Sequence, residues 1–266
     1  MITSSSNGRI KWVTSLLEKA KIRRKEELFV AEGMKMFLEA PRELIREVYV
    51  SQDLLNASND SELWVKTKEK LKEIPYEVVS SEVFRKMSDT VTPQGILSVL
   101  EFISYERKDL LTQSSPLLLV LENIQDPGNM GTIFRTAEGA GVNGIILSKD
   151  CVDIYNPKVI RSTMGSIYRV PFLVVNDLYE EMKKLQEEGM ILYAAALKDS
   201  LEYDAFDYRL PTAFIIGNEG NGLLKETIAA CDKTIRIPME GRVESLNAGV
   251  AASILSYEAY RQRRNA

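Results

Sequence analysis

Two polar side chains, Asn129 and Arg135, lie in the first of three glycine-containing stretches whose residue types are suited to chemistry. This stretch, Glu122 to Ala137, directly follows an apolar run and contains Gly128 and Gly131. Glycine permits the sharp turn that takes a buried strand into a helix, and we expect Arg135 about one turn into that helix. The stretch is neither a Walker loop nor a dinucleotide-binding GxGxxG, so alone it fits any strand-to-helix crossover equally well.

The other two stretches place strand ends and a helix start in one region. The apolar run from Ala213 to Ile216 stops at Gly217, and a second short strand, Thr234 to Ile237, stops at Pro238. Ser245 then precedes apolar residues at helical spacing, which makes it a candidate N-cap. Backbone amides and carbonyls freed at such ends, with little side-chain bulk over them, suit close contact with a flat polar ligand such as a nucleoside.

The composition excludes several kinds of chemistry. The 266 residues include no histidine, so Ser-His triads, zinc-histidine sites and imidazole acid/base catalysis are unavailable. Cys151 and Cys231 are the only cysteines and form no CxxC pair, which argues against a thiolate metal site and is typical of a reducing compartment. We therefore predict an enzyme or binding protein that uses no metal.

The charge pattern and the apolar runs indicate location and partners. No apolar run approaches the roughly 18 residues that span a bilayer, and the start of the chain lacks the apolar block of a signal peptide, so cytoplasmic residence is expected. The net charge of -4 does not by itself suggest nucleic acid, but basic residues dominate between Arg9 and Lys25. Arg23, Arg24 and Lys25 are candidates for RNA binding; a solvated helix face is an equally good interpretation.

The first hundred residues alternate helices with short strands and predict a small α/β domain over residues 1–103. The polar stretch 104–115 is the expected linker. The predicted helices span 7–25, 34–39, 61–72 and 81–87, with Ser81 as a cap, and the predicted strands span 28–31, 48–50, 76–79 and 95–102.

The remainder, residues 116–266, has the rhythm of a parallel sheet with helices on its faces. Strands are predicted at 117–121, 145–147, 170–175, 191–196, 213–216 and 234–237. Helices are predicted from Gly131 to Gly141, from Pro157 to Met164 after the cap Asn156, and from Leu178 to Glu188 after the cap Asp177.

The three motifs together carry a specific resemblance. NIQDPGNMGTIFRTAEGAG, FIIGNEGNGL and IRIPMEGRVESLNAGVAASILSYE, in this order, resemble the motifs of the SpoU (TrmH) family of RNA ribose 2'-O-methyltransferases in the SPOUT class. The match spans most of the region from Leu117 to Arg261, and the segment Asn156 to Gly165 also resembles the family. The N-terminal half more loosely resembles the ribosomal-protein-like substrate-binding domain often joined to it.

The resemblance implies an α/β fold in which a SPOUT-type parallel sheet with a C-terminal trefoil knot follows a small α/β substrate-binding domain. It implies a homodimer with each active site near the subunit interface, and S-adenosylmethionine as the methyl donor, bound largely through backbone groups. The positions implied for the cofactor are Gly217, Ile237 and Leu246, with Met239, Asn218 and Ala194 to Ala196, including Ala195, beside them. Asn218 stands where many relatives carry serine.

The same resemblance assigns catalytic positions. Arg135 matches the family's catalytic arginine; because arginine stays protonated in proteins, we expect an electrostatic clamp on phosphate and developing alkoxide rather than a base. The remaining polar motif positions are Asn129, Glu219, Ser245 and Asn247. Three of them also have a purely structural interpretation: a loop carboxylate for Glu219, an N-cap for Ser245 and a packing amide for Asn247.

The expected substrate is RNA, with 23S ribosomal RNA favoured and tRNA as the alternative. Lys158 and Arg161 lie three residues apart on one predicted helix face and could bind phosphates, although a solvated face is as good an interpretation. The alternative functions are an inactive RNA-binding protein of the same fold and a base methyltransferase of the SPOUT class. Target choice is expected to reside in the N-terminal domain.

Overall fold

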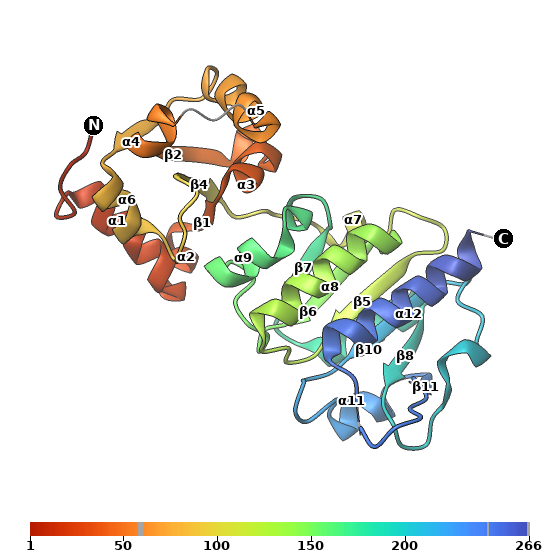
Figure 1. Cartoon of the computed structure of the whole chain (residues 1–266). Coiled ribbons are helices and arrows are strands. Elements are labelled where there is room, and N and C mark those ends of the chain that lie inside the picture. Colours follow the sequence, from red (N-terminus) through yellow and green to blue (C-terminus); the bar gives the residue numbers. More distant parts are fainter. Residues whose placement is uncertain (58–60, 244, 265–266) are drawn as a thin grey trace. The chain divides into compact units, whose positions relative to one another are not determined.

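The structure is a computed structural model, and it describes residues 1–57, 61–243 and 245–264. The chain forms two compact units, whose elements are labelled in Figure 1. The first consists of Met1–Ser104 together with Asp153–Tyr168, and the second of Tyr105–Val152 with Arg169–Ala266. Residues 153–168 therefore belong to the first unit although they lie beyond the linker predicted at 104–115.

A four-stranded mixed sheet forms the core of the first unit. Its order is β1 (Leu28–Glu32), β4 (Ile96–Glu101), β2 (Ile45–Ser51) and β3 (Glu77–Val79). The first two pairings are antiparallel and the last is parallel. The helices are α1 (Gly8–Glu18), α2 (Ala20–Glu26), α3 (Met34–Glu39), α4 (Gln52–Asn56), α5 (Glu62–Leu71) and α6 (Ser81–Met87), with a 3-10 turn at Arg42–Leu44.

The predicted N-terminal helix is two helices, because Lys19 adopts an extended conformation between them. The apolar positions Ile10, Val13 and Leu16 of α1 are buried, as their helical spacing predicted. The cap of α6 is Ser80 rather than Ser81, since the Ser80 hydroxyl accepts a hydrogen bond from the backbone amide of Val83.

Residues 153–168 carry α9 (Pro157–Thr163) within the first unit. Asn156 caps this helix through a 2.9 Å hydrogen bond from the Lys158 amide, with proline at the first helical position, as predicted. The Tyr155 ring stacks on Phe102 at 3.8 Å, and its hydroxyl exchanges hydrogen bonds of 2.9 and 3.0 Å with the backbone of Ile103. These contacts fasten the segment to the chain that leaves β4.

The second unit is built on a seven-stranded sheet in which every pairing is parallel. The strand order is β7 (Phe172–Val175), β6 (Gly144–Ser148), β5 (Leu117–Leu121), β10 (Thr212–Ile216), β8 (Ile191–Ala195), β11 (Lys233–Arg236) and β9 (Leu201–Glu202). Every residue of the neighbouring strands β5 and β10 is buried, as their continuous apolar runs predicted for strands covered on both faces. The trefoil knot stays a prediction of the family resemblance.

Helices cover this sheet (Figure 1). They are α7 (Arg107–Leu110), α8 (Pro127–Ala140), α10 (Leu178–Glu187), α11 (Lys225–Ala229) and α12 (Ala248–Arg263), with 3-10 turns at Ser166–Tyr168 in the first unit and Tyr203–Ala205 here. Helix α10 has the predicted cap, Asp177, whose carboxylate accepts from the Glu180 amide. No helix in the described ranges is long and apolar enough to cross a membrane.

Helices α8 and α12 pack side by side and carry two of the three motifs (Figure 1). The hydroxyls of Thr136 and Ser253 join them at 2.7 Å. Gly249 allows close approach, since a Cβ built there would lie 3.1 Å from the Thr132 side chain. The packing holds the N-termini of both helices against the same sheet.

Helix α8 begins four residues earlier than predicted, at Pro127 instead of Gly131. Asp126 is the N-cap, because its carboxylate accepts a 2.8 Å hydrogen bond from the backbone amide of Asn129. Proline is favoured at the next position, the first of the helix. Arg135 therefore lies about two turns into the helix rather than one.

Candidate active site

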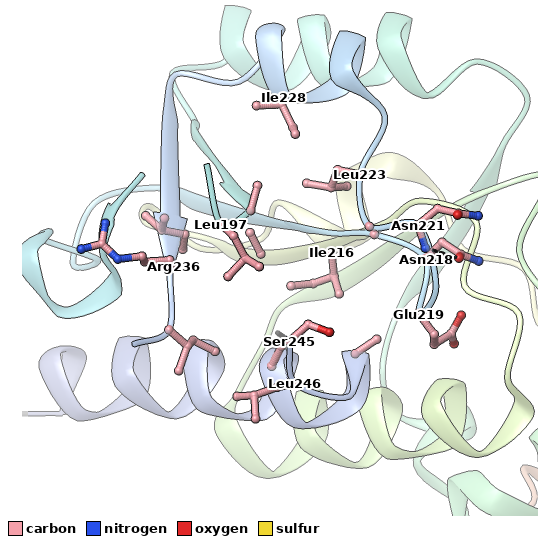
Figure 2. A pocket seen from close by; sticks show the side chains of 18 of the residues that line it. Leu197, Ile216, Asn218, Glu219, Asn221, Leu223, Ile228, Arg236, Ser245 and Leu246 are labelled. Atoms are coloured by element: carbon pink, nitrogen blue, oxygen red, sulfur yellow. Dashed lines mark hydrogen bonds between the residues drawn. The ribbon is translucent and has the colours of Figure 1, made fainter. Parts of the chain in front are cut away.

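A cavity of about 400 Å³ opens at the carboxyl ends of β8, β10 and β11 in the second unit (Figure 2). Its size is within the range of small-molecule sites. The structure brings together there all six positions expected at the cofactor: Ala195, Gly217, Asn218, Ile237, Met239 and Leu246. The predicted convergence of two strand ends and a helix start is thus present, with β8 as a third strand end.

The cavity combines an apolar interior with free backbone donors. The side chains of Leu197, Ile216 and Leu223 line it, and Figure 2 shows them around its centre. The backbone amides of Ile237 and Leu246 donate no hydrogen bond to another described residue. Such a lining suits a flat, largely apolar ligand with hydrogen-bonding groups at its edges.

Gly217 is required by the tight loop that forms one wall of the cavity. A Cβ at this position would lie 2.4 Å from the carbonyl carbon of Gly222 and from the backbone nitrogen of Leu223. The loop is closed by paired backbone hydrogen bonds between Asn218 and Gly222, of 3.1 and 2.9 Å, and Gly222 has φ of 67°. Any side chain at Gly217 would force the loop out of place.

The Asn218 side chain stabilises the same loop from inside. Its carbonyl oxygen accepts from the amides of Gly220 and Asn221 at 2.9 and 3.0 Å. Its Nδ2 donates to the carbonyl oxygen of Asn123, at the end of β5, at 2.9 Å. A serine hydroxyl is too short to span both sides in this way, so asparagine at this position has a structural role of its own.

A chain of hydrogen bonds joins the three motifs. Glu219, in the loop after β10, accepts from Nδ2 of Asn129 in α8 at 2.9 Å. Oδ1 of Asn129 in turn accepts from Nδ2 of Asn247, at the start of α12, at 2.6 Å. Glu219 also accepts from the backbone amides of Gln125 and Asp126 at 3.2 and 3.1 Å. The network ties the cavity wall to the N-termini of both helices.

The Glu219 carboxylate is stabilised in its charged form. Partial burial by itself would raise its pKa, but hydrogen bonds from Asn129 and from backbone amides, including those of Gln125 and Asp126, lower the pKa below its ordinary value. Glu219 is therefore an acceptor of hydrogen bonds near neutral pH and unsuited to donating a proton. The structural interpretation, a carboxylate that satisfies amides at the start of α8, describes the same contacts.

Asn247, and not Ser245, caps α12. The Asn247 side-chain oxygen accepts from the amides of Gly249 and Val250 at 2.9 and 3.2 Å, and the helix begins at Ala248. The prediction of Ser245 as N-cap is wrong because the cap lies two residues further along the chain. Ser245 is exposed instead and lines the cavity (Figure 2).

Arg135 is exposed on α8 and forms no hydrogen bond or salt bridge with a described residue. It is absent from the cavity lining, as are Asn129 and Asn247. Within one chain, therefore, the predicted catalytic arginine is available but is not part of the cavity.

Arg23 departs from its predicted role in RNA binding. It is only 3% exposed, and its guanidinium makes bonds of 3.0 and 2.6 Å to the Asp153 carboxylate. A third side of the guanidinium donates to the carbonyl oxygens of Leu16 and Leu17 at 2.7 and 3.0 Å. The Arg23 guanidinium is held in this buried ion pair and cannot reach a phosphate.

The other predicted RNA-binding residues are accessible in the first unit. Arg24 and Lys25 are exposed on α2, and Lys158 is exposed on α9. Arg161 is also exposed, with a loose ion pair of 3.5 Å to Asp89. Because α9 belongs to the first unit, Lys158 and Arg161 are carried by the same compact body as Arg24 and Lys25.

Glu122 supports the chain next to the cavity, although neither the motifs nor the composition pointed to it. It is 5% exposed, and its carboxylate accepts from the Leu224 amide at 2.8 Å and from the Thr227 hydroxyl. It thereby anchors the chain directly after the cavity loop. The signal in the sequence that could have identified Glu122 is its place directly after a fully apolar strand. Among the described residues, no group of three or more Cys, Asp or Glu is placed to hold a metal ion.

Two family models match the chain. Residues 116–257 match the SpoU rRNA Methylase family, and residues 7–98 match the MRM3-like substrate binding domain. The 23S rRNA (guanosine(2553)-2'-O)-methyltransferase RlmP of Bacillus subtilis is 31% identical over 259 residues, which are 96% of this chain and 97% of that protein. The 23S rRNA (guanosine-2'-O-)-methyltransferase RlmB of Ralstonia nicotianae is 35% identical over 189 residues, 69% of this chain and 75% of its own.

A solved structure agrees over almost the full length. The SpoU methyltransferase AviRb from Streptomyces viridochromogenes, in complex with the cofactor AdoMet, superimposes with a TM-score of 0.85 at 26% identity. The match covers 97% of this chain and 98% of that chain. Both compact units therefore have counterparts in a methyltransferase of known structure.

Proposed function

Because the chain belongs to the SpoU rRNA methylase family, we propose that it transfers a methyl group from S-adenosylmethionine to a ribose 2'-hydroxyl of RNA. The observation that carries this proposal is the hydrogen-bond chain from Glu219 through Asn129 to Asn247. It joins all three motifs beside a cavity suited to a nucleoside.

The cavity residues fit the methyl donor. The apolar interior would hold the adenosine, and the free amides of Ile237 and Leu246 would donate to its polar edges. Because Gly217 has no side chain, the backbone of the loop could contact the donor directly. When bound, the sulfonium supplies a methyl group already activated for transfer, so the protein has to supply alignment and charge stabilisation.

Alignment and charge stabilisation are the roles we assign to this chain's polar residues. Positioning two reactants can lower a barrier by about 7–11 kcal/mol. Arg135 would bind a phosphate next to the target ribose and stabilise the developing alkoxide. Asn129 and Glu219 would fix the start of α8, which carries Arg135, relative to the cavity. Ser245, exposed at the cavity, would contact the reacting groups.

The position of Arg135 supports a homodimer. The arginine is free and outside the cavity lining of its own chain, so a second copy would be needed to bring it to a bound donor. Helix α12, next to α8, exposes Val250, Tyr257 and Tyr260, which are 44%, 49% and 39% accessible. Large apolar side chains on one helix are suited to an interface between subunits.

The proposed substrate is 23S ribosomal RNA, with tRNA as the second candidate. RlmP and RlmB are both named as methyltransferases of 23S rRNA guanosines, and RlmP matches the chain over nearly its full length. The first unit would select the nucleotide to be methylated, and its residues Arg24, Lys25 and Lys158 would bind phosphates of the RNA. A ribosomal RNA substrate would place the protein in the cytoplasm, where Cys151 and Cys231 would stay reduced.

The proposal is tested by methylation of RNA in vitro. Purified protein is incubated with methyl-labelled S-adenosylmethionine and either 23S rRNA or tRNA. Nuclease digestion and mass analysis then assign the methyl group to ribose or base. We expect a labelled 2'-O-methyl nucleoside from 23S rRNA, whereas a base methyl group would point to the wider SPOUT class. Donor binding without transfer to either RNA would contradict the proposed substrates.

A further inference from the structure

Three charged residues line the cavity, and the side chains of two of them already have partners. Glu219 is held by Asn129 and by backbone amides. The Arg236 guanidinium donates to the carbonyl oxygen of Ser200 and lies 3.5 Å from a carboxylate oxygen of Glu202. Figure 2 shows it pointing away from the centre of the cavity. Each of these two groups therefore already has a partner within the chain.

The third charged residue, Lys198, is uncommitted. It follows β8, which ends at Ala195, and is exposed. It forms no hydrogen bond or salt bridge with any described residue. The chain turns back directly after it, since Asp199 has φ of 51° and the Ser200 hydroxyl donates to the carbonyl oxygen of Leu197 at 2.9 Å. Lys198 thus lies in a tight turn of the cavity wall with its ammonium free.

The methyl donor has a carboxylate that a cation at this position can bind. S-adenosylmethionine combines an adenosine, a sulfonium and an amino-acid tail that ends in a carboxylate. Burying a carboxylate among apolar side chains without a partner is costly, so the tail is expected to leave the interior defined by Leu197, Ile216 and Leu223. A lysine at an exposed position of the lining can pair with it while both stay partly hydrated.

We propose that Lys198 binds the carboxylate of the donor's methionine tail and so distinguishes complete donors from adenosine derivatives that lack the tail. The inference rests on the proposed function, because it assigns one subsite of the same cavity. Lys198 would be a specificity residue, since it touches the cofactor at a distance from the transferred methyl group. The interior would hold the adenosine whether or not Lys198 is present.

Calorimetry with two ligands tests this assignment in the full-length protein. S-adenosylhomocysteine carries the tail and 5'-methylthioadenosine does not. For Lys198→Ala we expect about tenfold weaker binding of S-adenosylhomocysteine, as for loss of one charge-assisted hydrogen bond, and unchanged binding of 5'-methylthioadenosine. Lys198→Arg should keep most of the affinity. Lys225→Ala, which removes an exposed lysine outside the cavity lining, is the matched control.

The outcomes separate this inference from the proposed function. If wild-type protein binds neither ligand, the methyltransferase proposal itself fails. If wild-type protein binds both, but Lys198→Ala weakens both equally or neither, the carboxylate assignment is wrong. Loss confined to S-adenosylhomocysteine, and reduced at high salt as expected for an exposed charge pair, supports it.

Discussion

Replacing Glu219 with glutamine should weaken the link between the cavity loop and the start of α8 at little change in volume. The glutamine oxygen can still accept from Asn129 and Asp126, but its amino group then faces the Gln125 amide, which now donates to Oε2 at 3.2 Å. Two donors would meet, and one of them would lose its partner. An unsatisfied buried donor costs about 1–3 kcal/mol, and because Glu219 is half-buried we expect about 1–2 kcal/mol of destabilisation.

The pH dependence of this loss follows from the lowered pKa of Glu219. A carboxyl group whose folded pKa lies below its unfolded value stabilises the protein above the unfolded pKa, about 4.3 for glutamate, and loses that contribution as pH falls through the folded pKa. The stability difference between wild type and Glu219→Gln should therefore be complete near neutral pH. It should shrink in acid, where Glu219 becomes protonated in the wild type.

Urea unfolding of both proteins at about pH 7 and about pH 4 measures this difference. Glu226→Gln, which changes an exposed carboxylate on α11, is the control and should have little effect at either pH. We also expect lower methyl transfer by Glu219→Gln, because the start of α8 is held less firmly to the cavity loop. Equal stability of Glu219→Gln and wild type at neutral pH, with full activity, would refute the role assigned to the network.

Three further substitutions test separate parts of the structure. Arg135→Ala should abolish methyl transfer while calorimetry shows unchanged donor affinity, because Arg135 is outside the cavity; near-normal turnover would remove it from the mechanism. Gly217→Ala should cost about 1–3 kcal/mol of stability in urea unfolding and should weaken donor binding. Gly220→Ala is the control, because a Cβ at Gly220 has ordinary contacts, and it should change neither stability nor donor binding. Arg23→Ala should destabilise the first unit by about 3–5 kcal/mol in urea unfolding, since it leaves Asp153 without its cationic partner. Arg24→Ala should change only the salt dependence of RNA binding.

The architecture of the second unit was predictable because its strands are continuous apolar runs. Residues 117–121 and 213–216 have no polar member, and strands of that kind must be covered on both faces. Helix starts were less predictable because several residues compete to be the cap. Asp126 and Asn247 each have a side-chain oxygen that reaches the next turn, and sequence spacing alone does not rank them against Gly131 or Ser245.

The cavity at the strand ends was predictable for a related reason. Strand ends leave backbone groups unpaired, and the breaks at Gly217 and Pro238 mark those ends in the sequence. The hydrogen-bond chain through Asn129 was less accessible, because Glu219 and Asn247 are separated from it by 90 and 118 residues. The family resemblance named these residues, but only the geometry shows that each one holds the next.

Arg23 shows why a run of basic residues is a weak guide to an RNA surface. Charge counts treat Arg23, Arg24 and Lys25 alike, yet successive residues of a helix point in directions about 100° apart. One of three neighbours is therefore turned inward, and its fate depends on whether an acidic partner meets it there. That partner is Asp153, 130 residues away, in the segment that returns from the second half of the chain. The same segment brings Lys158 into the first unit, so the buried pair that removes one cation from the proposed RNA surface also fixes the segment that supplies another.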